Sequence, residues 1–223
     1  MRARRRANAA GFTLLELLVS VMIVSILAIL AIPGMRQARD DRAAFSYART
    51  FSAIIHRARV RAAGRGAAHL VVWDAGSASR GRLLLFEALD GTAAPSGPNP
   101  VSSCKAPAQW TNISAIDPAN GKARLIEALD LNTAGINVDA DIKSELLLLG
   151  GSRAAGVLCV TPGGSTYAGY GSDMDGAVTD MEGRIPFTDV FELRIARHKA
   201  GSVVGLMRRV IAAGTSAPRI KSE

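Results

Sequence analysis

The stretch GFTLLELLVSVMIVSILAILAIPG, residues 11–34, decides how this chain is built. Residues 17–32 contain no charged side chain, and residues 12–32 would form about 32 Å of α-helix, enough for one crossing of a bilayer. An arginine cluster precedes the stretch, and such a cluster keeps its side of a membrane segment in the cytoplasm. We therefore expect one transmembrane helix, residues 12–34, with the part of the chain that follows it exported. The arginines are Arg2, Arg4, Arg5 and Arg6.

Glu16 is the most informative residue of this segment, because it places a carboxylate inside an apolar helix. A charge in a membrane helix costs roughly 2.5–3.5 kcal/mol at the helix centre and usually marks function. A secretory signal peptide would have a shorter apolar stretch followed by a small-residue cleavage site, whereas Ile32-Pro33-Gly34-Met35 follows here. A plain signal anchor accounts for the length and the arginines, but it gives no reason for Glu16.

The residues Gly11-Phe12-Thr13-Leu14-Leu15-Glu16 resemble the class III leader site of type IV pilins and pseudopilins. The resemblance implies that residues 1–11 are a leader, which a prepilin peptidase removes between Gly11 and Phe12 before Phe12 is N-methylated. It also implies that Glu16 neutralises the amino terminus of a neighbouring subunit when an inner-membrane assembly platform builds a filament. Pairing would make the burial of both charges tolerable. Pro33 fits the same family, in which a proline ends the spanning stretch.

Residues 35–66 continue as an amphipathic helix. Apolar residues at spacings of three and four form one stripe, and arginines lie off that stripe. Gly64 and Gly66 end the pattern. We therefore expect one helix from about Phe12 to Ala63, with its first half in lipid and its second half packed against a sheet. The stripe consists of Phe45, Ala48, Phe51, Ile55, Ala58 and Ala62.

Residues 67–223 have the pattern of a β-rich head. Short apolar runs alternate with turn-rich stretches such as residues 162–186, and residues 95–119 should form a surface loop. Strands at this density after one helix favour an antiparallel sheet packed on the helix, an α+β fold that the leader resemblance makes type IV pilin-like. The expected strands are His69–Trp73, Arg82–Glu87, Ser144–Leu149, Val157–Thr161, Phe191–Arg197 and Ser202–Val210.

Two segments of the head resemble the GspH/FimT group. Residues 51–73 carry the pair Ala58-Arg59, then glycines and a hydrophobic strand, and residues 160–164 resemble a strand followed by a Pro-x-Gly turn. The resemblance implies a minor pseudopilin, a subunit of the periplasmic pseudopilus of a type II secretion system, with other pseudopilins as partners. The alternative is a minor type IV pilin of the FimT or FimU kind, for pilus priming or DNA uptake. Residues 75–157 have no assignment.

The head holds two cysteines, too few for a disulfide scaffold and without CxxC spacing. In a periplasmic head, Cys104 and Cys159 would form one disulfide. The acidic run SDMDGAVTDMEG could offer oxygen ligands to Ca²⁺, but it lacks the distant Glu of an EF-hand, so a solvated loop without a cofactor is favoured. Its carboxylates are Asp173, Asp175, Asp180 and Glu182.

The carboxyl-terminal part of the head is basic, and some members of the FimT branch bind DNA through such residues. No aromatic side chain lies among these cations to stack on bases, so a solvated strand face is favoured over DNA binding. Of the formal charge of +8, four arginines belong to the leader, and 8 − 4 leaves +4 without it. The candidate nucleic-acid residues are Arg194, Arg197, Lys199, Arg208 and Arg209.

The sequence gives little support for catalysis. His56, His69 and His198 occur in unrelated contexts, and none belongs to an HExxH motif. The chain also lacks a GxxxxGK[ST] loop and a GxSxG elbow. We therefore expect a structural subunit and not an enzyme.

Overall fold

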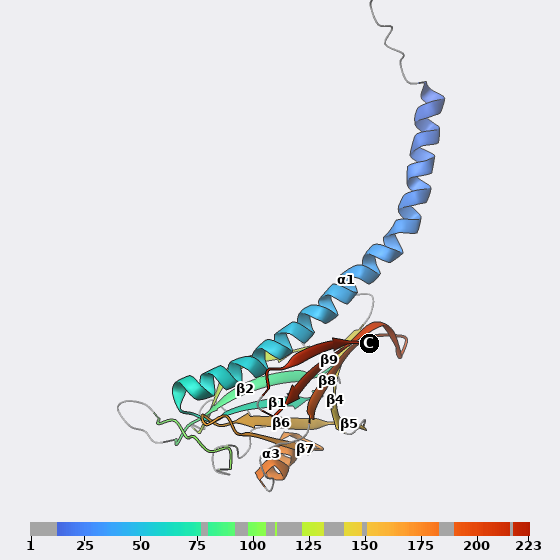
Figure 1. Cartoon of the computed structure of the whole chain (residues 1–223). Coiled ribbons are helices and arrows are strands. Elements are labelled where there is room, and N and C mark those ends of the chain that lie inside the picture. Colours follow the sequence, from blue (N-terminus) through green and yellow to red (C-terminus); the bar gives the residue numbers. More distant parts are fainter. Residues whose placement is uncertain are drawn as a thin grey trace, which may run out of the picture. The chain divides into compact units, whose positions relative to one another are not determined.

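The computed structural model describes residues 13–76, 80–91, 98–105, 110, 122–131, 141–148, 151–182, 190–214 and 216–223 (Figure 1). Gly11 and Phe12 lie outside the described residues, as does most of the expected loop 95–119. The chain divides into two compact units, Met1–Arg39 and Asp40–Glu223.

The helix α1 spans Leu14–Arg65, so the prediction of one long helix is confirmed. Thr13 caps its start, because its hydroxyl accepts a hydrogen bond from the Glu16 backbone N–H at 3.2 Å. Gly66 ends it with a φ of +69°, a left-handed conformation that favours glycine, and donates to the Ala62 carbonyl at 3.1 Å.

The head contains two five-stranded antiparallel sheets, where the sequence analysis expected one. The first has the order β3-β2-β1-β6-β7 and consists of Ala123–Asp130, Arg82–Ala88, His69–Asp74, Ala155–Val160 and Thr166–Gly171. The second has the order β10-β9-β8-β4-β5 and consists of Arg219–Ser222, Ser202–Ala213, Val190–Lys199, Asp141–Leu148 and Gly151–Arg153. All six predicted strands are present. The prediction of a turn-rich stretch over residues 162–186 is wrong, because it holds β7 and the helix α3, Met174–Glu182.

The strands β1, β2 and β6 of the first sheet are buried on both faces, which explains the continuous apolar run of β1. Val71 and Trp73 of that strand belong to a core shared with Phe51 of α1 and with the second sheet. Leu70 and Val72, which alternate with them, pack on the other face in a second core under α3. The second half of α1 thus lies on the sheets, as expected (Figure 1).

The buried face of α1 differs from the predicted stripe at Phe45. Phe45 is 36% exposed, whereas Ala44 and Ile54 are buried. The guanidinium groups of Arg49 and Arg208 lie over the Phe45 ring, 5.0 and 5.5 Å from its centre. The Phe45 ring is therefore covered by two guanidinium groups at the rim of the core. Its neighbour Ala44 is buried in the core in its place.

Candidate functional site

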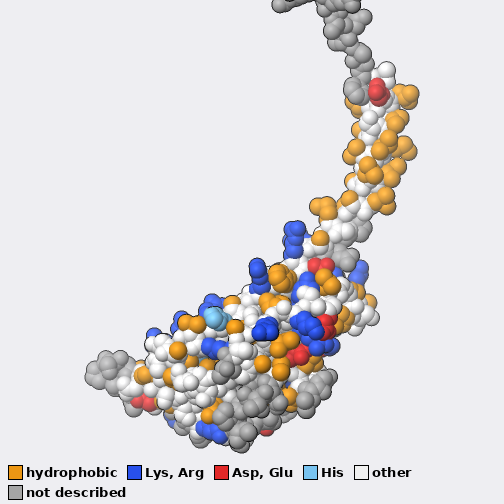
Figure 2. Space-filling model, in the orientation of Figure 1, with side chains coloured by type: hydrophobic (Ala, Val, Ile, Leu, Met, Phe, Trp, Pro, Cys, Tyr) orange, Lys and Arg blue, Asp and Glu red, His pale blue; other side chains and the backbone are white. Residues whose placement is uncertain are grey.

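The first half of α1 presents exposed apolar side chains, many of which are visible on the face drawn in Figure 2. Leu14–Ile32 is long and apolar enough to span a membrane, with a mean hydropathy of 2.8, and none of it is buried against the rest of the chain. Its hydroxyls bond within the helix: Ser20 Oγ donates to the Glu16 carbonyl at 2.7 Å and Ser25 Oγ to the Val21 carbonyl at 2.8 Å. This surface therefore suits an apolar environment, in which polar groups must find partners internally.

Glu16 is the one ionisable residue of this apolar surface, and it lies in the first turn of α1. Its side chain is exposed. A carboxylate in apolar surroundings needs a cation to stay ionised at a tolerable cost. The geometry of Glu16 toward Gly11 and Phe12 lies outside the described residues. Pro33 lies within α1, which continues through it to Arg65.

At the start of the second unit, Arg197 of β8 joins α1 to the second sheet. Its Nη1 lies 3.3 Å from Asp40 Oδ2 and its Nε lies 3.0 Å from Asp41 Oδ1. Gly205 of β9 makes room, since a Cβ there would lie 2.2 Å from Arg197 Nη2. The prediction that Arg197 belongs to a solvated face is wrong, because its side chain is only 4% exposed.

Most of the other candidate nucleic-acid residues also have partners in the head. Arg194 pairs with Glu145. Arg209 lies 3.1 Å from Glu192 and 2.8 Å from Glu223. Arg208 covers Phe45, whereas Lys199 is exposed beside the turn that joins β8 to β9. These cations thus act mainly within the fold, and the ion pairs leave little free positive charge for a phosphate backbone.

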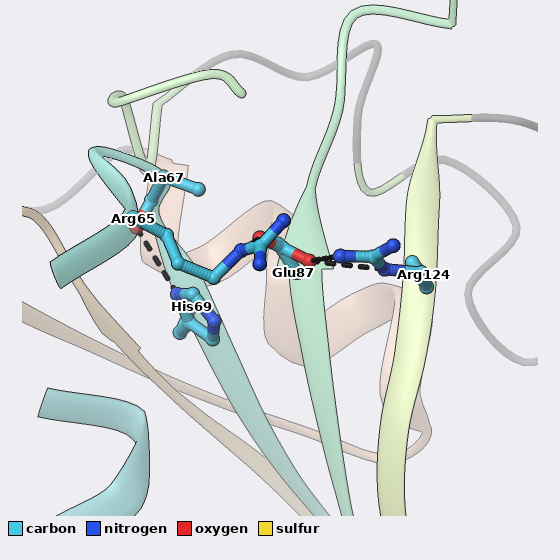
Figure 3. A network of polar contacts seen from close by, with 5 residues as sticks. All are labelled: Arg65, Ala67, His69, Glu87 and Arg124. Carbon is cyan, nitrogen blue, oxygen red and sulfur yellow. Dashed lines mark hydrogen bonds and ion pairs between the residues drawn. The ribbon is translucent and has the colours of Figure 1, made fainter. Parts of the chain in front are cut away.

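Glu87 of β2 forms a polar centre that the sequence analysis missed (Figure 3). Its side chain is fully buried, and it accepts hydrogen bonds from Arg65 at the end of α1 and from Arg124 of β3. Burial alone would raise the pKa of Glu87, but the two guanidinium groups bring it below its usual value. A single carboxylate in the apolar run RLLLFEA was the signal for this site.

His69 of β1 pairs across the sheet with Glu87. It is fully buried, and its Nδ1 lies 3.1 Å from the Ala67 carbonyl. Burial lowers the pKa of His69, and Arg61 and Arg65 act in the same direction, against the Ala67 carbonyl and Glu87. The ring is therefore held neutral within a structural junction.

Cys104 and Cys159 form a disulfide, with an S–S distance of 2.14 Å and a Cα–Cα distance of 5.9 Å. Both residues are buried in the core under α3. The indole Nε1 of Trp110 donates to the Cys104 carbonyl at 3.2 Å. The bridge thereby ties a segment without regular structure to β6.

The four acidic residues of the run at 173–182 do not converge on one point. Asp173 caps α3, since its Oδ1 accepts from the Gly176 N–H at 2.7 Å, and Asp180 Oδ2 accepts from the Tyr170 N–H at 2.9 Å. Asp175 lies in the first turn of α3 and Glu182 at its end, where burial raises the pKa of Glu182. Within the described part of the chain, no group of three or more His, Cys, Asp or Glu residues is arranged to hold a metal ion.

Comparison with known proteins points to the amino terminus. A family model, the prokaryotic N-terminal methylation motif, matches residues 6–32. No curated protein and no solved structure matched the chain. The motif covers the apolar helix and Glu16, and the head that follows has an α+β fold consistent with type IV pilins. The motif therefore indicates a structural, type IV pilin-like protein that is processed by prepilin peptidase and assembles into pilin-type filaments.

Proposed function

We propose that this protein is a minor pseudopilin of the GspH kind, a structural subunit of the periplasmic pseudopilus of a type II secretion system. One observation carries the proposal: α1 is a single helix whose first half is apolar, exposed and charged only at Glu16, and whose second half is built into a folded head. A filament of such subunits would bury the first halves together and leave the heads outside.

The proposal places the mature chain in the inner membrane, crossed once, with the head in the periplasm until the subunit enters the filament. The Cys104–Cys159 disulfide supports this location, because disulfides form and persist in oxidising compartments such as the periplasm. The arginines before the span favour the same orientation.

Glu16 would have its role during assembly. After cleavage following Gly11, the N-methylated amino terminus of Phe12 carries a positive charge, and Glu16 of an adjacent subunit would neutralise it. Burying both charges as a pair costs much less than burying either one alone. A subunit without this carboxylate would leave an unpaired cation inside the filament.

A minor type IV pilin of the FimT or FimU kind, for pilus priming or DNA uptake, is the second candidate. It is favoured by exposed cations along α1 and at the β8–β9 turn, which could follow a phosphate backbone. The ion pairs of Arg194, Arg197 and Arg209 weigh against it, because they leave less free charge on the carboxyl-terminal strands.

The test is a strain that lacks this chain, complemented with the wild type, Glu16→Ala or the control Ser20→Ala. We expect Glu16→Ala to be processed but absent from pseudopili isolated from the periplasm, with loss of protein secretion, while Ser20→Ala assembles. Replacing Gly11 with a bulky residue should leave the leader attached, as measured by the mass of the chain. Normal incorporation of Glu16→Ala would contradict the pairing. Unimpaired secretion together with lost pilus function or DNA uptake would favour the second candidate.

A further inference from the structure

The turn between β8 and β9 lies at the end of the head where the chain leaves toward the apolar span. Two contacts within the head fix the direction of β9 along α1. Arg208 covers Phe45, and Arg59 donates to the Gly214 carbonyl at 2.7 Å. Residue numbers increase in the same direction along both elements, from Phe45 to Arg59 and from Arg208 to Gly214. The chain of β9 and that of the second half of α1 therefore run in the same direction. The start of β9 and its turn, residues 199–203, therefore lie at the Asp40 end of the head (Figure 1).

Only a short piece of chain separates this turn from the candidate span. Asp40 follows Ile32, the last residue of the span, by eight positions, which is about 12 Å of helix. Arg197 pairs with Asp40, and β8 ends two residues later at Lys199. The headgroup layer on each side of a bilayer is roughly 5–7 Å deep. The connection between the turn and the span is therefore short enough for the turn to reach that layer.

The side chains at this end of the head combine exposed apolar groups with cations. Val203 and Leu206 of β9 are 45% and 50% exposed. Lys199 and Arg42 are exposed, and within the described part of the chain neither makes an ion pair. The turn itself is tight, because Ala200 has a φ of 50°. Apolar side chains flanked by Lys and Arg bind membrane interfaces, and the cations are attracted to anionic lipid.

Three carboxylates near this turn are held by other residues. Asp40 and Asp41 pair with Arg197. Glu223, whose backbone bonds to Met207 of β9, pairs with Arg209 and Lys221. Among the described residues, no ion pair involves Lys199 or Arg42, so both cations are free to act on a partner outside the described part of the chain.

We propose that the β8–β9 turn docks the head on the membrane that holds the span. Val203 and Leu206 enter the headgroup layer, and Lys199 and Arg42 bind anionic lipid headgroups. This inference rests on the proposed function, since it requires the span to be inserted. Docking would hold the head against the bilayer before assembly, so entry into a filament would have to break it.

The test uses the full chain in lipid nanodiscs, which leave both bilayer faces accessible. Because both native cysteines are in the disulfide, Ser202→Cys at the turn can carry a single environment-sensitive dye, and Ala63→Cys at the other end of α1 is the control. In discs of phosphatidylglycerol and phosphatidylcholine, the dye at position 202 should emit at shorter wavelength and be less quenched by acrylamide than the dye at position 63. Lys199→Glu should lower the ratio of docked to free heads about fivefold or more, while Lys122→Glu should not.

The outcomes separate the two proposals. Failure of the chain to co-elute with discs would remove the anchor and the proposed function with it. Co-elution with equal quenching at positions 202 and 63 would overturn only the docking. Equal protection at position 202 in pure phosphatidylcholine, or no effect of Lys199→Glu, would overturn the assignment of anionic lipid as the partner.

Discussion

Replacing Arg197 with methionine tests whether its ion pairs fix α1 on the second sheet. The Arg197 and Asp40 side chains are only 4% and 8% exposed, so the variant would leave a buried carboxylate without its partner. Removing one partner of a buried pair costs roughly 3–5 kcal/mol. Because Asp41, the second acceptor, is 26% exposed and keeps contact with water, we expect the lower value, about 3 kcal/mol.

The assay is urea unfolding in a non-ionic detergent, followed by the fluorescence of Trp73 and Trp110, both of which are buried. With a slope of about 2 kcal/mol per molar urea, the midpoint should fall by roughly 1.5 M. Arg194→Met is the matched control, because its pair with Glu145 is about one-third exposed and should contribute at most about 1 kcal/mol.

A double variant separates burial of a charge from loss of packing. Asp40→Asn combined with Arg197→Met should be more stable than Arg197→Met alone, since the remaining buried group is then neutral. The reasoning is refuted if Arg197→Met costs no more than Arg194→Met, or if adding Asp40→Asn brings no recovery.

Three further perturbations probe the head, each by the same unfolding measurement. Gly169→Ala should cost about 1–3 kcal/mol, because its Cβ would lie 2.1 Å from a backbone oxygen of α3; Gly163→Ala, with open space around it, should be nearly neutral, and equal costs would exclude the close contact. Reducing the Cys104–Cys159 bridge should cost about 4 kcal/mol for a loop of this length, and an unchanged midpoint in reductant would contradict its role. Burial lowers the pKa of His69 in the folded chain, so below about pH 6.5 the unfolded chain should bind a proton at His69 more readily than the folded chain. The free energy of unfolding should therefore decrease as the pH is lowered through this range. His69→Gln should flatten this part of the pH curve, and an unaltered slope would show that other groups carry it.

The sequence predicted those elements whose apolar residues recur with a clear helical or strand period. The apolar run before Pro33 and the stripe after it gave the long helix, and six apolar runs gave six strands. Of the missed strands, β5, β7 and β10 are polar, short or rich in glycine, and Gly169 and Gly171 of β7 let α3 approach closely. Single-sequence patterning gives no signal for such packing, because the reason for each glycine lies in another element.

The polar residues of the head show a second limit. Arg194 and Arg197 lie three positions apart in β8, on either side of a register shift, and the first is part-exposed whereas the second is buried. What separates them is Asp40, which is distant in sequence, and Gly205, which leaves space for the guanidinium. The basic residues therefore predicted a solvated face. The ion pair between Arg197 and Asp40 is visible only once β8, α1 and β9 are placed together.

The first half of α1 differs from the head because its side chains must find their stabilising contacts in lipid or in other subunits. The head pairs its buried charges and buries its own core, whereas none of residues 14–32 is buried in the described chain. Moving this helix from lipid into a bundle of identical helices gains little hydrophobic energy, because lipid tails are as apolar as leucine. In the proposed assembly, the group whose surroundings change most is Glu16, which would exchange a place near the membrane surface for a buried position. Assembly should therefore depend more on pairing of this one carboxylate than on the many apolar side chains around it.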